Sequence, residues 1–467
     1  MSEREPISPD AAETPRKAEA LYGLTPALVA AFTSAVEGGD VARIRRLAEP
    51  IHAADQADLL ERLMPEQRAI AVRALGPELD PELLTHLNDE VRDEIVEQMS
   101  PKEVAAALSE LEVDDQVALI EGLDKPAQRE ILEAISTEER VDIEEALTYP
   151  EASAARLMQR DVIAVPTYWT VGQIIDHMRE QAAELPESFY DIFVVNPKHE
   201  PVGTIGLSTL LRNKRPVVVR TIMNTDIKVI PADMDREEVA YLFDQYDLVS
   251  APVVERNGRL IGVITIDDVV DVIREEAEED ILHMGGVADT ARYAGVLSTS
   301  RGRLPWLFVN LATAFLAAAV IGQFKETIAQ VVALAVLMPI CASMAGNAGM
   351  QTVTVTIRSL ALKELTPANA LRIFVKECLV GGINGFVFAL VVGLAAGLWF
   401  GNLKIGLIIA GAMVINMLNA GISGILTPLA FNRLKLDPAP ASGVFLTAMT
   451  DVVGYASFLG LATLFLI

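Results

Sequence analysis

The uneven distribution of charge along the chain is the feature that most constrains its fold. Between Leu304 and Ile467 only eight basic and five acidic residues interrupt a mostly apolar sequence, so this half carries a net charge of +3. The 303 residues before it hold 30 basic and 59 acidic residues, a net charge of -29. An acidic half is therefore joined to an apolar half. This division excludes a purely soluble enzyme, and the acidic half argues against a nucleic-acid partner.

The apolar half contains five stretches long enough to cross a bilayer. They lie near 304–322, 328–346, 378–400, 404–431 and 441–467. With the N-terminus inside, eight Lys and Arg residues fall on the inner side and only Lys325 and Lys404 on the outer side, as the positive-inside rule requires. The first residues lack the apolar core of a signal peptide. We therefore expect a multi-pass protein of the cytoplasmic (inner) membrane, in contact with lipid, with its N-terminus in the cytoplasm and its C-terminus outside.

Residues 21–150 follow a repeat of twelve residues, after a polar tail (1–20) that we expect to be disordered. Apolar residues recur at this interval in nine successive positions: Ile51, Leu63, Leu75, Leu87, Met99, Leu111, Leu123, Ile135 and Leu147. Turn or capping residues such as Ser100-Pro101 follow several of them, which is typical of helix starts. Helices of about two turns must stack to bury their apolar sides. The repeat predicts an all-α superhelix of short helices, and an ordinary bundle with accidental spacing is the alternative.

Residues 151–271 contain an internal duplication. Segment 162–166 matches 227–231, 191–196 matches 251–256, and 201–206 matches 259–264. Each copy is expected to form strand, helix, strand, strand and helix, an α/β arrangement that resembles a tandem pair of CBS domains.

The resemblance to CBS pairs implies a small ligand, often an adenine nucleotide, so ATP is a candidate. Thr265 and Asp267 in the second copy have the Thr-x-Asp form that could hold a ribose. The first copy has Ser208, Thr209 and Leu210 there and lacks the aspartate.

Residues 272–303 link the duplicated region to the first apolar stretch. Their first part is strongly acidic, with a helical pattern. A solvated helix face explains such charge. The alternative is a lever that couples the acidic half to the membrane half.

Asp451 is the carboxylate in the apolar half that an interfacial position does not explain, since it lies about ten residues into the last stretch. Thr447 precedes it by one helical turn and shares its helix face. A carboxylate beside hydroxyl and carbonyl oxygens is the ligand set of a hard cation. Ionisable groups inside a membrane indicate function, although a hydrogen bond that only packs two helices is the alternative.

A second polar patch follows the second apolar stretch. Its proline frees a backbone carbonyl, and its glycines allow close helix approach. The patch is marked by Pro339, Gly346, Asn347, Gly349 and Gln351.

These two motifs and the order of the domains resemble the MgtE family of bacterial magnesium channels. The resemblance covers nearly the whole chain beyond the tail. It implies a homodimer whose ion path runs along the subunit interface, lined mainly by the second and fifth spans. The pore carboxylate of the family falls on Asp451, and a helix carbonyl falls on Thr447. A further ligand position falls on Gly443, where only backbone or a bound water could contribute.

The resemblance also implies regulatory Mg²⁺ sites in the acidic half. The positions that match are Asp115 and Glu103 in the helical region, Asp235, Glu237, Asp244, Asp247, Asp268 and Asp271 in the second CBS domain, and Glu276, Glu279 and Asp280 in the connecting helix. Independently of the family, a net charge of -29 repels itself, and divalent cations shared between carboxylates would relieve the repulsion.

The sequence therefore predicts a multidomain membrane protein: a helical superhelix, a CBS pair, an acidic connecting helix and, from residue 304 to 467, five transmembrane helices. We expect a Mg²⁺ channel, gated by intracellular Mg²⁺, and not an enzyme. A transporter of another divalent cation, such as Co²⁺ or Mn²⁺, is the alternative of the same fold. A nucleotide-sensing membrane regulator is the alternative of another class. No Gly-x-x-x-x-Gly-Lys-Ser/Thr loop is present, which argues against an ATPase pump.

Overall fold

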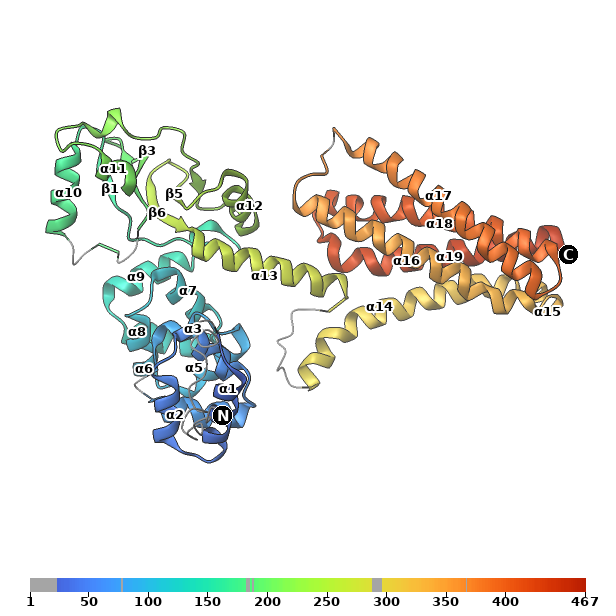
Figure 1. The fold of residues 1–467 in the computed structure, drawn as a ribbon, viewed down its shortest axis with the longest axis horizontal. Coiled ribbons are helices and arrows are strands. Elements are labelled where there is room, and N and C mark those ends of the chain that lie inside the picture. Colours follow the sequence, from blue (N-terminus) through green and yellow to red (C-terminus); the bar gives the residue numbers. More distant parts are fainter. Residues whose placement is uncertain (1–22, 77–78, 182–184, 187–188, 288–295, 367) are drawn as a thin grey trace, which may run out of the picture. The chain divides into compact units, whose positions relative to one another are not determined.

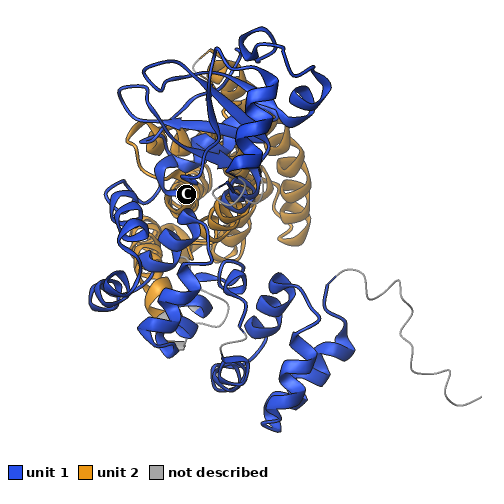
Figure 2. Ribbon diagram, turned by 90° about the vertical axis from the view of Figure 1, so that its left-hand side faces the viewer, with its two compact units in different colours: residues 1–273 blue, residues 274–467 orange. Residues whose placement is uncertain are grey.

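The computed structural model describes residues 23–76, 79–181, 185–186, 189–287, 296–366 and 368–467 (Figure 1). The predicted tail at 1–20 lies outside these residues. The chain divides into two compact units, residues 1–273 and residues 274–467, which Figure 2 shows in different colours. The finer domain boundaries, after residues 150, 271 and 303, stay predictions.

The first part of unit 1 is an array of short helices. They are α1 (Pro26–Glu37), α2 (Val41–Ala48), α3 (Ala53–Glu61), α4 (Pro65–Leu75), the 3-10 turn η3 (Pro81–Leu84), α5 (Asp89–Gln98), α6 (Pro101–Leu108), α7 (Val113–Glu121), α8 (Lys125–Ala134) and α9 (Thr137–Ala146). Their buried side chains form one continuous apolar core.

The twelve-residue repeat coincides with the ends of these helices. Met99, Ile135 and Leu147 are the C-caps of α5, α8 and α9, and all three pack against the shared core. The next residue begins the following helix, because Ser100 and Ser136 each form a capping box with a glutamate three residues on. The prediction of stacked short helices is confirmed.

Two small sheets of identical topology follow. In the first, β1 (Ala164–Pro166) pairs in parallel with β2 (Asp191–Val195), which pairs antiparallel with β3 (Pro201–Gly206). In the second, β4 (Ile230–Pro231), β5 (Ser250–Val254) and β6 (Leu260–Thr265) repeat that order. Even the irregularity in register recurs, at Val194/Val195 and at Val253/Val254.

Helices and 3-10 turns precede and connect the strands of both copies. They are η4 (Ala154–Arg156), α10 (Val171–Glu180), α11 (Leu207–Arg212), η5 (Val219–Thr221) and α12 (Arg236–Tyr246). Helix α13 (Ile266–Met284) begins directly after β6 and runs without interruption through the acidic connecting sequence. The last CBS helix and the start of the predicted connector are thus one helix of 19 residues.

Five helices of unit 2 are long and apolar enough to cross a membrane. They are α14 (Val296–Gln323, apolar from Thr299), α16 (Ala333–Ala361), α17 (Ala370–Trp399), α18 (Leu403–Arg433) and α19 (Pro438–Leu466). Helices α16 to α19 lie side by side (Figure 1). Helix α18 is the most enclosed of the five, with 56% of its apolar window buried.

The second of these helices does not begin where the sequence predicts. Residues Lys325–Gln330 form a separate short helix, α15, and non-helical backbone at Val331 separates it from α16. Helix α16 then continues to Ala361, so the polar patch lies inside the helix and does not follow it. Just after the patch, the hydroxyls of Thr352 and Thr356 donate to backbone carbonyls one turn earlier, so these buried polar groups have partners within the helix itself.

Candidate functional site

Helix α19 holds the predicted pore residues on one face. Thr447 is exposed and Asp451 is half-buried, one turn further along the helix. The Thr447 hydroxyl donates to the carbonyl oxygen of Gly443 at 2.9 Å. Carbonyl, hydroxyl and carboxylate oxygens therefore follow one another along two turns of α19.

Helix α16 carries an exposed polar stripe. Ser343, Asn347, Gln351, Thr354 and Arg358 are all exposed, although the helix is apolar overall. Their spacing of three or four residues places them on one face of the helix. Uncompensated polar groups are costly against lipid, so this stripe indicates contact with water or with another protein surface.

Helices α16 and α19 approach each other closely at the level of these residues. A Cβ at Gly349 would lie 2.7 Å from the side chain of Leu446, so a larger residue there would force Leu446 to move. A Cβ at Gly346 would lie 3.8 Å from the Thr450 hydroxyl, and Thr450 is completely buried. The close approach at Gly349 sets the α16 motif beside the part of α19 that holds Thr447 and Asp451, whereas at Gly346 an added Cβ would make only an ordinary contact; the predicted role of the two glycines stays a prediction.

An acidic cluster forms in unit 1, where the start of α7 meets the start of α13. It brings two predicted residues, Asp115 and Asp268, together with Asp114, which the sequence analysis missed. Asp114 is 8% exposed and lies beside the Asp268 carboxyl group. Gln159 extends the network, because its amide lies 3.5 Å from Asp268 Oδ2 and 3.4 Å from the Thr265 hydroxyl. The one sequence signal for Asp114 is that it is adjacent to Asp115.

Burial raises the pKa of every aspartate in this cluster. It is the largest cause in each case, and neighbouring carboxylates add to it. The pKa of Asp115 rises to about 6 and that of Asp268 to about 7, even though the Thr265 hydroxyl stabilises the Asp268 carboxylate. The pKa of Asp114 also rises, because it is buried and because the carboxylates of Asp268, Asp115 and Glu112 lie close to it.

These shifts predict how stability depends on pH in the absence of divalent cations. The unfolded chain releases these protons near pH 4, whereas the folded cluster keeps them up to about pH 6 or 7. The cluster's contribution is therefore greatest below pH 4 and is lost as the pH rises to about 7. Thermal unfolding of the full-length protein between pH 5 and 8 should show a weaker pH dependence in Asp268→Asn than in the wild type. Asp226→Asn, at an exposed loop position, should leave the wild-type slope unchanged; equal slopes for all three proteins would contradict the prediction.

The remaining predicted carboxylates do not gather at one point. Asp235 caps the N-terminus of α12 by accepting from Glu237 N at 2.9 Å, and Asp247 caps its C-terminus. About 18 Å of helix separates the two, and Asp244 lies between them. Glu103 is exposed and caps α6: it accepts from Ser100 N at 2.8 Å, and this backbone hydrogen bond lowers its pKa. No single ion could contact all of these side chains.

The end of α13 lies against the start of α19, within unit 2. His283 Nδ1 lies 3.0 Å from Asp437 Oδ2, and Asp437 also caps α19. Burial raises the pKa of Asp280, and the carboxylates of Asp437 and Glu279 raise it further. Met284 packs with Leu446 and its neighbours on α16 and α19, and its carbonyl would lie 3.8 Å from a Cβ at Gly443. The end of α13 is thus in contact with α19, the helix that holds Asp451, and the sequence analysis missed this contact.

The two predicted nucleotide residues differ in accessibility. Thr265 is 7% exposed and its hydroxyl donates to Asp268 Oδ2 at 2.8 Å. Asp267 is exposed at the start of α13. Of the pair, Asp267 is the side chain that a ligand could reach directly.

Comparison with known proteins places these features in a family. Models of the MgtE divalent cation transporter, the MgtE intracellular N domain and the CBS domain match residues 338–461, 51–152, and 154–215 with 219–275, respectively. The magnesium transporter MgtE of Thermus thermophilus is 30% identical over 94% of this chain and 98% of that protein. The chain belongs to the MgtE family. The magnesium transporter MgtE of Bacillus subtilis is 27% identical over 92% of this chain and 95% of that one.

A solved structure, the cytosolic domain of the Mg²⁺ channel MgtE in complex with ATP, is also similar. It is 30% identical, with a TM-score of 0.48, and the match covers 52% of this chain and 99% of that one. Membership of the MgtE family, together with the five apolar helices, makes this a multi-pass membrane protein. The predicted multidomain fold and the resemblance are confirmed, and the named relatives are transporters.

In this MgtE chain the acidic cluster suits a hard cation better than a soft one. All of its charged donors are carboxylate oxygens, and Asp114 Oδ1 is buried without a hydrogen-bond partner among the described residues. Within those residues, no group of three His, Cys, Asp or Glu side chains is already arranged to hold a metal. Mg²⁺ keeps several of its waters, so one or two carboxylates can hold it.

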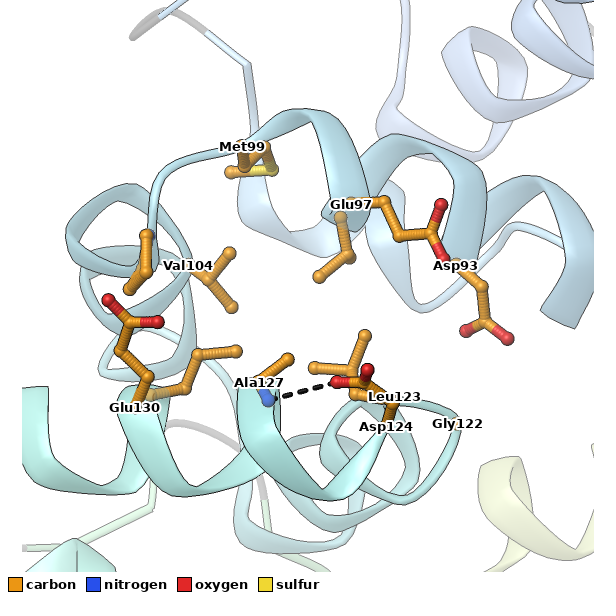
Figure 3. Close-up of a pocket in the computed structure, with 12 residues that line it drawn as sticks. Asp93, Glu97, Met99, Val104, Gly122, Leu123, Asp124, Ala127 and Glu130 are labelled. Carbon is orange, nitrogen blue, oxygen red and sulfur yellow. Dashed lines mark hydrogen bonds between the residues drawn. The ribbon is translucent and has the colours of Figure 1, made fainter.

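The helical array also contains a cavity of about 420 Å³, between α5, α6 and α8 (Figure 3). Val104, Leu123 and Ile131 form apolar walls, whereas Asp93, Glu97, Asp124 and Glu130 contribute carboxylates. Neither Asp115 nor Glu103 lines it. The cavity is therefore separate from the predicted regulatory residues.

Proposed function

We propose that this MgtE protein carries Mg²⁺ across the cytoplasmic membrane along a path lined by α16 and α19. The observation that carries the proposal is the position of Asp451, halfway along an apolar helix, on the same face as the exposed Thr447. A carboxylate there attracts cations and excludes anions. Because Mg²⁺ dehydrates reluctantly, we expect it to pass largely hydrated.

The protein acts as a homodimer in this proposal. The polar stripe of α16 and the Thr447 face of α19 are exposed in the single chain. A second copy would face these groups with its own and enclose a water-filled path between the subunits. Eight Lys and Arg residues lie in the segments that would face the cytoplasm, and only two lie in those that would face outside. This difference supports an orientation with the N-terminus in the cytoplasm and the C-terminus outside.

Intracellular Mg²⁺ regulates the channel through the acidic half. When the carboxylates of Asp114, Asp115 and Asp268 are ionised they repel one another, and sharing a divalent cation would turn that repulsion into attraction. Asp271, Glu276, Glu279 and Asp280 continue the acidic surface along α13. The contact of His283 with Asp437 provides the means by which a displaced α13 would act on α19.

Uptake by liposomes containing the purified protein tests the proposed function. A Mg²⁺-sensitive dye inside the vesicles should report uptake that exceeds that of protein-free vesicles. Mn²⁺ and Co²⁺ supplied in turn distinguish a Mg²⁺ channel from a transporter of other divalent cations. ATP binding without any ion flux would favour the nucleotide-sensing regulator.

ATP is proposed as a ligand of the CBS pair. The exposed carboxylate of Asp267 would accept from the ribose hydroxyls, and hydrogen bonds to charged groups contribute about 1.5–3 kcal/mol. Asp267→Ala should therefore weaken ATP binding about tenfold in calorimetry of the full-length protein. Asp226→Ala removes an exposed carboxylate elsewhere in the same region and should bind ATP as the wild type does. Equal affinity of all three proteins would leave Asp267 as a residue of the helix start alone.

A further inference from the structure

Helix α18 carries a row of polar side chains in the middle of its membrane-spanning length. Asn416, Asn419 and Ser423 follow one another at intervals of three and four residues, so they share a face. Asn416 is 0% exposed and Ser423 is 6% exposed. Polar side chains in the middle of a membrane helix cost free energy unless they have hydrogen-bond partners. The partners of these three residues therefore indicate their role.

Asn416 joins α18 to both helices of the proposed ion path. Its Nδ2 donates to the backbone carbonyl oxygen of Cys341 in α16 at 3.1 Å. The same amide lies against Gly454 of α19, where a Cβ would overlap it. Any side chain larger than glycine at position 454 would therefore displace Asn416 or α19.

Asn419 makes a second contact with α19. Its Nδ2 lies 3.4 Å from the backbone carbonyl oxygen of Met449, and its Oδ1 accepts from the hydroxyl of Ser423 at 3.3 Å. Met449 precedes Asp451 by two residues, and Gly454 follows it by three. Helix α18 thus contacts α19 on both sides of Asp451.

We propose that Asn416 and Asn419 are positioning residues that fix the depth and rotation of α19, and thereby hold Asp451 at the ion path. The proposal rests on the function proposed above. Apolar packing alone tolerates small sliding of one helix past another, whereas the bond from Asn419 to the Met449 carbonyl has one position along α19. Asn416 is held by its bond to Cys341 of α16, and its amide then blocks movement of α19 at Gly454. Both asparagines act by positioning α19, and neither contacts the transported ion.

A labelling experiment tests this role without requiring transport. A chain with Cys341→Ala, Cys378→Ser and Asp451→Cys keeps the carbonyl that Asn416 contacts and has one thiol, at position 451. Adding Asn416→Leu, which has the same number and branching of side-chain heavy atoms as asparagine but cannot donate a hydrogen bond, should slow labelling by a positively charged thiol reagent about fivefold or more. Asn310→Leu, an exposed asparagine of α14, is the matched control and should leave the rate unchanged. An unchanged rate with Asn416→Leu overturns the proposal, and Asn419→Ala gives an independent version of the test if Asn416→Leu does not fold.

Flux measurements separate positioning from simple packing. In the otherwise native chain, Asn416→Leu should raise the half-saturating Mg²⁺ concentration about tenfold, with a smaller effect on the maximum rate. Gly454→Ala should impair flux because its Cβ overlaps Asn416. In Asn416→Ala with Gly454→Ala the overlap is relieved but the bond to Cys341 is still missing, so flux should stay impaired. Recovery of wild-type flux in that double variant would mean that only the volume of the side chains matters, and would overturn the proposal.

Absence of Mg²⁺ uptake by the wild type would instead refute the proposed function, while the labelling result would still decide the role of Asn416.

Discussion

Asp451→Ala is expected to reduce Mg²⁺ flux about thirtyfold or more while the protein stays folded. Even at the dielectric constant of water, a carboxylate attracts a divalent cation about 4 Å away by about 2 kcal/mol, which corresponds to about thirtyfold. The surroundings of Asp451 are less polar than water, so the actual loss should be larger. The side chain is half-buried on an otherwise apolar helix, so we expect the fold to tolerate replacement of the carboxylate by a smaller neutral group. The measurement is Mg²⁺ uptake by liposomes at matched protein content.

Two further variants define what the loss means. Asp451→Asn keeps the shape of the side chain and should lose as much flux as the alanine variant, since the charge is the essential property. Asn310→Leu changes an exposed polar residue of α14 and should conduct normally. Wild-type uptake by Asp451→Asn would show that the carboxylate charge does not govern permeation.

Neutralising the acidic face of α13 is expected to remove inhibition by internal Mg²⁺. The variant combines Asp268→Asn, Asp271→Asn, Glu276→Gln, Glu279→Gln and Asp280→Asn. These five carboxylates lie within thirteen residues of one continuous helix, and Asp268 also meets Asp114 and Asp115 of α7. If shared cations hold the closed state together, the variant should conduct at millimolar internal Mg²⁺ and lose its Mg²⁺-dependent protection from protease. The concentration giving half inhibition should rise more than tenfold in patch recordings.

The opposite result is physically distinct. If bare repulsion keeps the channel open, removing the charges should close it without metal. We expect the first result, because diffuse repulsion is screened within about 8 Å at physiological salt whereas ligand contacts are specific. The matched control removes five exposed carboxylates of the helical array and changes the net charge equally: Glu110, Glu130, Glu133, Glu138 and Glu144. Unchanged inhibition in the α13 variant, or equal loss in the control, would refute a specific role for α13.

Local periodicity predicted the architecture because each element depends mainly on its own sequence. The apolar residue every twelve positions marks the ends of successive helices, as at Met99 and Ile135, since caps and apolar contacts recur together there. The predicted start of the second membrane helix, near residue 328, was wrong by contrast, because α16 begins at Ala333. Hydropathy does not report the non-helical backbone at Val331, nor the hydroxyl-to-carbonyl bonds by which the buried Thr352 and Thr356 find partners within α16.

The sequence by itself determined the division into an acidic and an apolar half, the duplicated sheets and the one carboxylate deep in the last helix. Charge, hydropathy and repetition are properties of the chain before it folds. Only the tertiary structure decided which groups meet: Asp114 with Asp268, His283 with Asp437, and Asn416 with Gly454. These pairs are separated by 38 to 154 residues along the chain. Their contact depends on how whole helices pack, which sets distance and burial, and therefore raises the pKa of Asp268 and leaves room for no side chain at position 454.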